Sequence, residues 1–149
     1  MSQPGRVQLL VYDLSRGMAT AMSQSILGQQ IEGIWHTGIQ VFNTEYFFGG
    51  GIQAQPQGMF AMQHQMPAVR TLDFGVTSRT KAELQTFLMS IQNRFNATTY
   101  DLLQNNCNNF SDTVSQFLVG NHQLQILSSL HHSSCLRILI REHFIVMIR

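Results

Sequence analysis

Short runs rich in apolar and β-branched residues mark where strands are expected along the chain. They cover residues 7–12, 34–42, 46–48 and 69–74. Asn43 and Thr44 lie between the second and third runs and predict a tight hairpin turn. The glycines at residues 49–51 then end this hairpin, because glycine tolerates the positive φ of such turns. These runs predict an antiparallel sheet.

Apolar residues spaced three and four apart predict helices in the second half of the chain. One stripe consists of Leu84, Phe87, Leu88, Ile91 and Phe95. Thr80 and Glu83 form a capping-box pair at its expected beginning. A second stripe consists of Phe110, Val114, Phe117 and Leu118. Asn105 or Asn106 is its expected N-cap, and Gly120 its expected end. Strands and helices together predict an α+β fold, with the sheet packed against helices.

Two further segments connect these elements. Asp13 and Ser15 are suited to cap a short helix around residues 16–22. Residues 53–67 are rich in Gln, Met, Gly and Pro, and we expect them to form a long surface loop in which His64 is solvated. Loops of this length in compact domains are often functional.

The composition narrows the class of protein. With 149 residues, 44% of them hydrophobic and 11% charged, the chain fits one domain with a packed core. The net charge is +1 and the basic residues are scattered, so we expect no nucleic-acid partner. The apolar run at residues 135–148 is shorter than the roughly 20 residues of a membrane span, and Arg141 and Glu142 interrupt it. We therefore expect no transmembrane segment.

The cysteine content indicates a reducing environment. The chain contains two cysteines, Cys107 and Cys135, which are too few for a disulfide framework and lack metal-ligand spacing. We expect neither a metal site nor a cofactor. The first residues lack the apolar run of a signal peptide. The expected location is therefore the cytoplasm, with the nucleus as a second location, where a free thiol is stable.

Cys107 stands at the expected beginning of the second helix. Exposed backbone N–H groups and the helix dipole favour a thiolate there, so we expect the pKa of the thiol to fall from about 8.5 toward neutrality. A nucleophilic thiolate needs a proton-handling partner, and His36 on the second expected strand is the best candidate. The residues alone leave open that Cys107 is a small buried side chain and that His36 is structural.

Several stretches follow one another in an order that is typical of one family. They are residues 11–15 (VYDLS), 34–37 (IWHT), 45–52 (EYFFGGGI), 100–103 (YDLL) and 106–111 (NCNNFS). Together they resemble the PPPDE family, permuted papain-fold peptidases that include the desumoylating isopeptidases. The resemblance implies a papain-like peptidase domain over residues 1–120 and a His–Cys dyad, with His36 as the base and Cys107 as the nucleophile. Residues 121–149 form a divergent C-terminal tail, which we expect to be peripheral and unnecessary for the dyad. The alternative is that residues 138–148 replace a core element.

The activity that the resemblance implies is that of a cysteine-dependent isopeptidase. Such an enzyme removes SUMO, or another ubiquitin-like modifier, from lysines of its target proteins, and the family also implies homodimers. Two alternatives remain open. The same dyad could serve a thioesterase that acts on S-acylated proteins, because a thiol leaves more easily than an amine. The altered tail would also suit an inactive isoform that binds proteins carrying ubiquitin-like modifiers.

The remaining candidates have supporting roles. The backbone N–H of Cys107 is one expected oxyanion donor, and the side-chain amide of Gln104 or Asn105 is a candidate for the second. Trp35 and Asn106 are candidates for lining the substrate groove. The sequence does not identify a third residue that orients the base.

Overall fold

One antiparallel sheet organises the described part of the chain. The computed structural model describes residues 5–27, 33–102 and 104–120. Within them, one five-stranded sheet has the order β4-β3-β2-β1-β5. The strands are β1 (Arg6–Asp13), β2 (Trp35–Val41), β3 (Thr44–Gly49), β4 (Gly51–Pro56) and β5 (Arg70–Val76). The helices are α1 (Met18–Leu27), α2 (Met59–His64), α3 (Lys81–Ser90) and α4 (Cys107–Val119). The expected α+β arrangement is confirmed.

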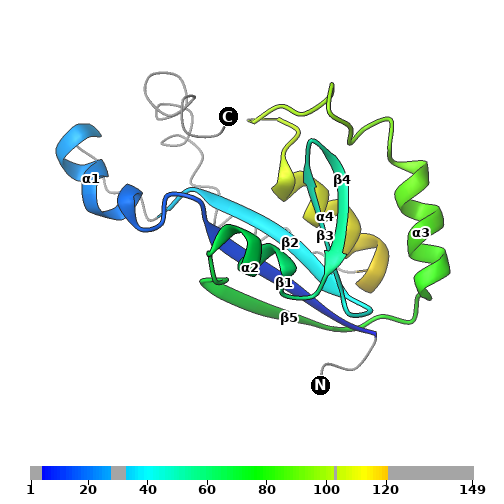
Figure 1. Ribbon diagram of the computed structural model, residues 1–149. Coiled ribbons are helices and arrows are strands. Elements are labelled where there is room, and N and C mark those ends of the chain that lie inside the picture. The colour runs from blue at the N-terminus through cyan, green and yellow to red at the C-terminus, as the bar shows by residue number, and fades with distance from the viewer. Residues whose placement is uncertain (1–4, 28–32, 103, 121–149) are drawn as a thin grey trace.

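Helices cover both faces of the sheet (Figure 1). α4 packs on one face, and α3 lies beside it, where Phe87 and Phe117 stack with ring centroids 4.1 Å apart. α2 lies on the opposite face, over β1, and α1 extends away from one end of the sheet. Different helices therefore pack on the two faces, and each face has a separate hydrophobic core.

The larger core lies between the sheet and α4. Side chains alternate across a strand, so Val7, Leu9 and Val11 of β1 all point to this face and are fully buried. α4 contributes the stripe expected from the sequence, and its members Phe110, Val114 and Leu118 are buried in the same core. Burying one such side chain stabilises a fold by about 1.5–3 kcal/mol. This face is therefore the main source of hydrophobic stabilisation.

The smaller core lies under α2 on the opposite face. It consists of Leu10, Tyr12, Phe47, Phe60 and Met66. Leu10 and Tyr12 alternate with the β1 residues of the larger core, and Phe47 comes from β3. Phe60 is the buried residue of α2 and anchors this short helix on the sheet.

The sheet forks between β2 and β3. These strands pair from Val41↔Thr44 to Ile39↔Tyr46, and the register ends there. β3 continues to pair with β4 up to Gly49, while β2 continues along β1 down to Trp35. Figure 1 shows the β3–β4 hairpin diverging from β2 beyond this point. The first half of β2 therefore has one edge that β3 does not cover.

The prediction of a long loop over residues 53–67 is wrong. β4 pairs with β3 along its whole length, and α2 follows it. β4 lies at the edge of the sheet and its side chains are at least partly exposed, so no alternation of apolar and polar residues marks it. Pro56 is tolerated because it ends an edge strand. α2 buries one residue, Phe60, and a single apolar residue produces no helical stripe.

Most other expected elements are confirmed, with small changes in their ends. The helix expected at residues 16–22 begins at Met18 and continues to Leu27. α3 has the expected capping box but ends at Ser90, and the following turn still buries Phe95. Gly120 ends α4 in a left-handed conformation with φ of 67°, as expected. The expectations for the tail fall on residues 121–149, outside the described residues.

Candidate functional site

The beginning of α4 is fixed by a reciprocal cap. The Asn106 side-chain oxygen accepts hydrogen bonds from the backbone N–H groups of Asn108 and Asn109, at 2.9 and 3.3 Å. The Asn109 side-chain oxygen accepts the backbone N–H of Asn106 at 2.9 Å, which completes a capping box. The amide of Asn106 also donates to the carbonyl of Leu102 at 2.9 Å. The expected N-cap is confirmed, and Cys107 is the first residue of the helix.

Thr37 connects β2 to this helix end. Its hydroxyl oxygen lies 2.8 Å from the Asn108 side-chain oxygen and 2.9 Å from the Ser111 hydroxyl oxygen. It also lies 3.5 Å from the carbonyl oxygen of Cys107. All four residues are buried. This polar cluster holds the strand position of Thr37, and therefore the backbone of the preceding His36, against the beginning of α4.

Burial governs the protonation of Cys107. The residue is 5% exposed, and burial raises the pKa of its thiol. The backbone N–H groups of Thr37, Asn108 and Cys107 itself lower this pKa, but their effect is smaller than that of burial. The expectation that the helix end lowers the thiol pKa toward neutrality is therefore wrong. In the free protein near neutral pH, Cys107 is a thiol.

The imidazole of His36 lies on the α2 face of the sheet. It stacks on Phe60 with centroids 4.8 Å apart and an interplanar angle of 17°, and it meets the edge of Phe47 at 5.5 Å. Burial lowers the pKa of His36 to about 4, with a further contribution from nearby His64. His64 itself is exposed, as expected, and its ring contacts Phe60 at 4.4 Å. His36 is therefore neutral near pH 7, and its Nε2 is buried without a hydrogen-bond partner.

The two dyad candidates are connected through Thr37, which follows His36 and contacts the beginning of α4. Their own side chains are not hydrogen-bonded to each other. Within the described residues, no hydrogen bond joins Cys107 Sγ to the His36 ring, and the thiol donates to Asn108 Oδ1 at 3.9 Å. Thr37 faces α4 and His36 faces α2, because neighbouring residues of a strand point to opposite faces. The edge of β2 that β3 leaves uncovered lies between them. The His36–Cys107 dyad stays a prediction.

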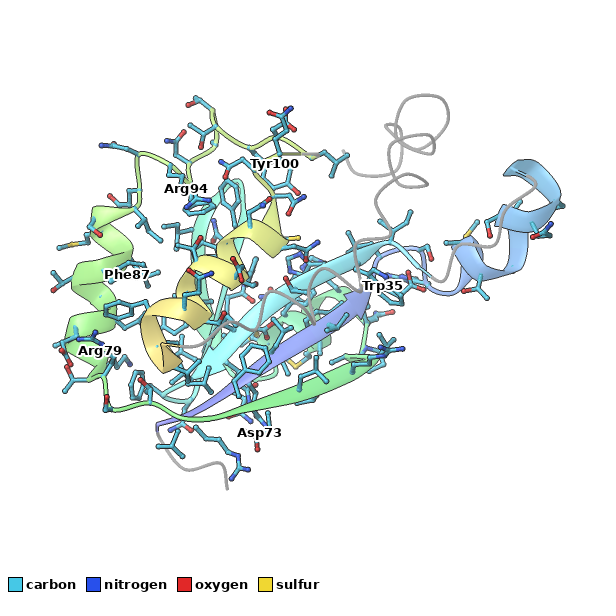
Figure 2. All side chains as sticks on the ribbon, turned by 180° about the vertical axis from the view of Figure 1, so that it is seen from behind. Trp35, Asp73, Arg79, Phe87, Arg94 and Tyr100 are labelled. Atoms are coloured by element: carbon cyan, nitrogen blue, oxygen red, sulfur yellow. The ribbon has the colours of Figure 1, made fainter. Side chains whose placement is uncertain are left out.

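The other candidates from the sequence surround the beginning of α4. Figure 2 shows Tyr100 near this helix end and Trp35 at the beginning of β2. Trp35 is half-buried at the first position of β2, and Asn106 is buried in the cap. The Asn105 amide donates to two loop carbonyls, of Arg94 at 2.7 Å and Thr99 at 3.0 Å. This commits both of its hydrogens to the loop.

Gln104 is the candidate amide that remains at the surface. Its side chain is exposed, and its backbone N–H donates to Asp101 Oδ1 at 2.9 Å. Its position at the end of the loop before α4 keeps it available as the second oxyanion donor. The roles assigned to Gln104, Asn105, Trp35 and Asn106 stay predictions.

Sequence reasoning missed a buried carboxyl group on the same face of the sheet as His36. Glu45 of β3 is 0% exposed, and Tyr12 of β1 donates its phenol hydrogen to Glu45 Oε1 at 2.9 Å. Burial raises the pKa of Glu45, and the hydrogen bond from Tyr12 acts in the opposite direction. Glu45 Oε2 is buried without a partner. The signal available in the sequence was a lone acidic residue on an apolar strand, between Thr44 and Tyr46.

The described residues contain neither a candidate metal site nor a candidate membrane-spanning helix. No group of three or more His, Cys, Asp or Glu side chains there is arranged to hold a metal ion. No helix in the described ranges is long and apolar enough to cross a membrane. Cys107 is a free cysteine, and Cys135 lies outside the described residues.

Comparison with known proteins places these features in a family. The sequence profile described as "PPPDE putative peptidase domain" matches residues 5–140. Desumoylating isopeptidase 1 of Homo sapiens is 43% identical over 116 residues, which are 76% of this chain and 67% of that protein. Desumoylating isopeptidase 1 of Xenopus laevis is 41% identical over 119 residues, 78% of this chain and 69% of the relative. The desumoylating isopeptidase 1 homolog of Caenorhabditis elegans is 30% identical over 95 residues, 59% of this chain and 28% of the relative.

Proposed function

Because the chain belongs to the PPPDE peptidase family, we propose that it is a cysteine-dependent isopeptidase that releases SUMO from lysine side chains of cytoplasmic and nuclear proteins. The observation that carries the proposal is the 43% identity to a desumoylating isopeptidase. It is supported by a capped helix that begins at Cys107 and is bonded to the strand of His36. In this proposal Cys107 is the nucleophile and His36 the base.

The protonation states place the proton on Cys107 before the attack, with His36 free to accept it. Burial raises the thiol pKa of Cys107 and lowers that of His36 to about 4, so the free pair is thiol and neutral imidazole. His36 takes the thiol proton as sulfur bonds to the isopeptide carbonyl carbon. The imidazolium then gives this proton to the lysine nitrogen as the C–N bond breaks. Water hydrolyses the resulting thioester and restores the thiol.

The negative charge that develops on the carbonyl oxygen needs donors at the beginning of α4. The backbone N–H of Cys107 is at the first helical position, where N–H groups have no partner within the helix. Gln104 supplies the second donor in this proposal, since the Asn105 amide is committed to loop carbonyls. Trp35, half-buried at the beginning of β2, lines the groove for the extended modifier tail.

The chemical step requires the imidazole to meet the thiol. His36 reaches Cys107 around the β2 edge that β3 leaves uncovered, and substrate binding at this edge brings the two side chains together. In structures without substrate, catalytic hydrogen bonds are often long or absent and tighten when substrate binds. The separation of the two side chains in the free protein is therefore compatible with the mechanism.

A covalent trap tests the proposal. SUMO with a C-terminal electrophile should form an adduct with the full-length protein, and peptide mass spectrometry should locate it on Cys107. Cys107→Ser should abolish the adduct, whereas the matched control Cys135→Ser should keep it. A ubiquitin probe and a fluorogenic acyl thioester are run in parallel. Adducts with ubiquitin alone would change the substrate, and turnover of the thioester alone would indicate a thioesterase. The absence of every adduct, with Cys107 still alkylated by iodoacetamide, would indicate a binding module.

A further inference from the structure

Two buried polar atoms without partners lie on the same face of the sheet. They are His36 Nε2 on β2 and Glu45 Oε2 on β3. An unpaired polar atom inside a protein costs roughly 1–3 kcal/mol, so such atoms are rare and call for an explanation. Both lie on the α2 face, where His36 contacts Phe60 and Glu45 bonds to Tyr12.

Gly38 explains how Glu45 reaches the neighbourhood of His36. Gly38 follows His36 at the next position of β2 that faces α2. A Cβ atom at this glycine would lie 2.6 Å from Glu45 Oε1, so the carboxyl group occupies the space above it. Tyr12 lies on β1 directly opposite His36 and reaches across β2 to the same carboxyl group. The carboxyl group is thus held from both neighbouring strands over Gly38.

We propose that Glu45 is the positioning residue of His36, held in place by Tyr12 over Gly38. The proposal rests on the proposed function, in which His36 is the base. Glu45 lies over Gly38, and same-face neighbours of one strand, such as Gly38 and His36, are about 6.6 Å apart. One water between the carboxyl group and the imidazole would bridge a gap of this size. Glu45 Oε2 thereby becomes the partner of His36 Nε2, and both orphaned atoms are satisfied.

This partnership decides which ring nitrogen is available to the thiol. The hydrogen bond made by one imidazole nitrogen determines where the proton sits on the ring. With Nε2–H donated toward Glu45, Nδ1 carries the lone pair and accepts the proton of Cys107. Without the carboxyl group the ring can adopt either tautomer, and only one of them can serve as the base. Glu45 therefore acts through His36 and touches neither substrate nor thiol.

Titratable groups from four elements lie in this part of the sheet. Tyr12 comes from β1, Glu45 from β3 and His64 from α2. Cys107 of α4 adjoins the neighbouring residue Thr37. Of these groups, Glu45 is the carboxylic acid, and burial raises its pKa as it raises that of the Tyr12 phenol.

The experiment compares Glu45→Gln, Tyr12→Phe and the control Tyr46→Phe in the full-length protein. Glu45→Gln keeps shape and removes the charge, and it should lower kcat for a SUMO conjugate at least about tenfold with little change in KM. Tyr12→Phe frees the carboxyl group and should have a smaller effect of the same kind. Tyr46 is also a buried tyrosine, but it faces the larger core, so its variant should leave kcat and its pH profile unchanged.

Nitrogen NMR of the histidine rings gives a readout that a purely structural role would not move. The protein is labelled with ¹⁵N-histidine, and the His36 signals are assigned with His36→Gln. They should show one tautomer with Nε2 protonated, and Glu45→Gln should mix the tautomers. An unchanged tautomer and pH profile in Glu45→Gln would overturn the proposal, even if the melting temperature changed. If His36→Gln retained full activity, the base assignment would fail, while the tautomer measurement would still report separately on Glu45.

Discussion

The α4 face of the sheet buries a continuous apolar core, whereas the α2 face combines a few aromatic rings with unpaired polar atoms. On the first face, buried side chains from the strands, α3 and α4 form one cluster. Thr37 and Ser111, which are buried there, are hydrogen-bonded to each other, although Asp112 Oδ1 of α4 has no partner. On the second face, His36 Nε2 and Glu45 Oε2 are buried without partners under the short helix α2.

This difference suggests that the α4 face mainly stabilises the fold, while the α2 face carries the candidate base. A well-packed apolar face stabilises the fold in proportion to the area that it buries. Unpaired polar groups reduce stability, and such groups concentrate at functional sites, where their shifted pKa values serve catalysis. The sheet therefore keeps its stabilising core on one side and His36 on the other, with Cys107 at the edge where they meet.

Cys107→Ser gives the largest expected effect. It should lower kcat/KM for a SUMO conjugate by at least about 10³-fold, because the serine hydroxyl is a far weaker nucleophile. The melting temperature and circular dichroism should stay close to those of the wild type, since the two side chains are similar in size. Turnover measured by gel with purified conjugate checks the prediction. Full activity in a folded serine variant would show that another residue is the nucleophile.

Removing one phenyl ring from each face compares the two cores directly. Phe110→Ala should lower the free energy of unfolding by about 3–5 kcal/mol, because Phe110 is fully buried in the larger core. Phe60→Ala should cost less, because α2 has six residues and can move to fill the space. It removes the ring that stacks on His36, so it should lower kcat/KM more than its loss of stability explains.

Urea denaturation and kinetics at a temperature where both variants are folded check this pair. An equal loss of stability in Phe60→Ala and Phe110→Ala would mean that the two faces contribute alike. Unchanged kcat/KM in Phe60→Ala would mean that the aromatic ring does not support the imidazole. Either result would contradict the proposal that the α4 face mainly stabilises the fold and the α2 face mainly supports His36.

The pH dependence of stability should carry the signature of His36. Its folded pKa of about 4 lies below the unfolded value of about 6.5, so the unfolded chain binds the proton more readily. Stability is fully present above pH 6.5 and falls as the pH drops toward 4, by up to about 3 kcal/mol. His36→Gln should lose this part of the dependence. Glu45, with its pKa raised by burial, acts in the opposite direction, so both curves are measured with Glu45 intact.

The check is urea denaturation at steps between pH 7.5 and 4.5 for both proteins. Parallel curves for wild type and His36→Gln would show that His36 is not buried as a neutral group.

Removing a helix cap should have the smallest effect on stability, and the caps of α3 and α4 can be compared directly. Asn106→Ala and Thr80→Ala each remove the side chain that caps a helix through a capping box. Each should cost about 1 kcal/mol of stability. Asn106 also places Cys107 at the first position of α4, so its variant should lower kcat/KM several-fold, while Thr80→Ala should not. Equal kinetics in the two variants would show that the cap matters for folding alone.

Local signals explain why the beginning of α4 could be predicted. The N-cap Asn106, its partner Asn109 and the apolar stripe all lie within one short stretch, so hydrogen-bonding rules that act between near neighbours suffice. The same holds for the Thr80 capping box of α3. The residues alone made His36 the best candidate for the base, and the resemblance to the PPPDE family added the roles of His36 and Cys107 as a dyad. The family match confirms the resemblance.

Long-range arrangements explain what could not be predicted. Glu45 meets Tyr12 only because β1, β2 and β3 are neighbours in that order and because Gly38 leaves room above β2. The pattern of apolar residues within one segment cannot predict this contact between side chains of different strands. The wrong expectation for the Cys107 pKa has the same origin, since the helix end acts locally while burial depends on the whole fold. β4 and α2 were missed because an edge strand and a helix with one buried residue show no pattern.

The hydrogen bonds of Thr37 determine when β2 and α4 can pack together during synthesis on the ribosome. They join residues that lie 71 and 74 positions apart, at Asn108 and Ser111. Closing a loop of this length is slow compared with forming a hairpin, and it requires that α4 has already left the exit tunnel. Until then Thr37 of β2 lacks its hydrogen-bond partners in α4, and Cys107, the proposed nucleophile, is not in position. Under the proposed function, a nascent chain therefore cannot act on conjugates until α4 has docked on the sheet.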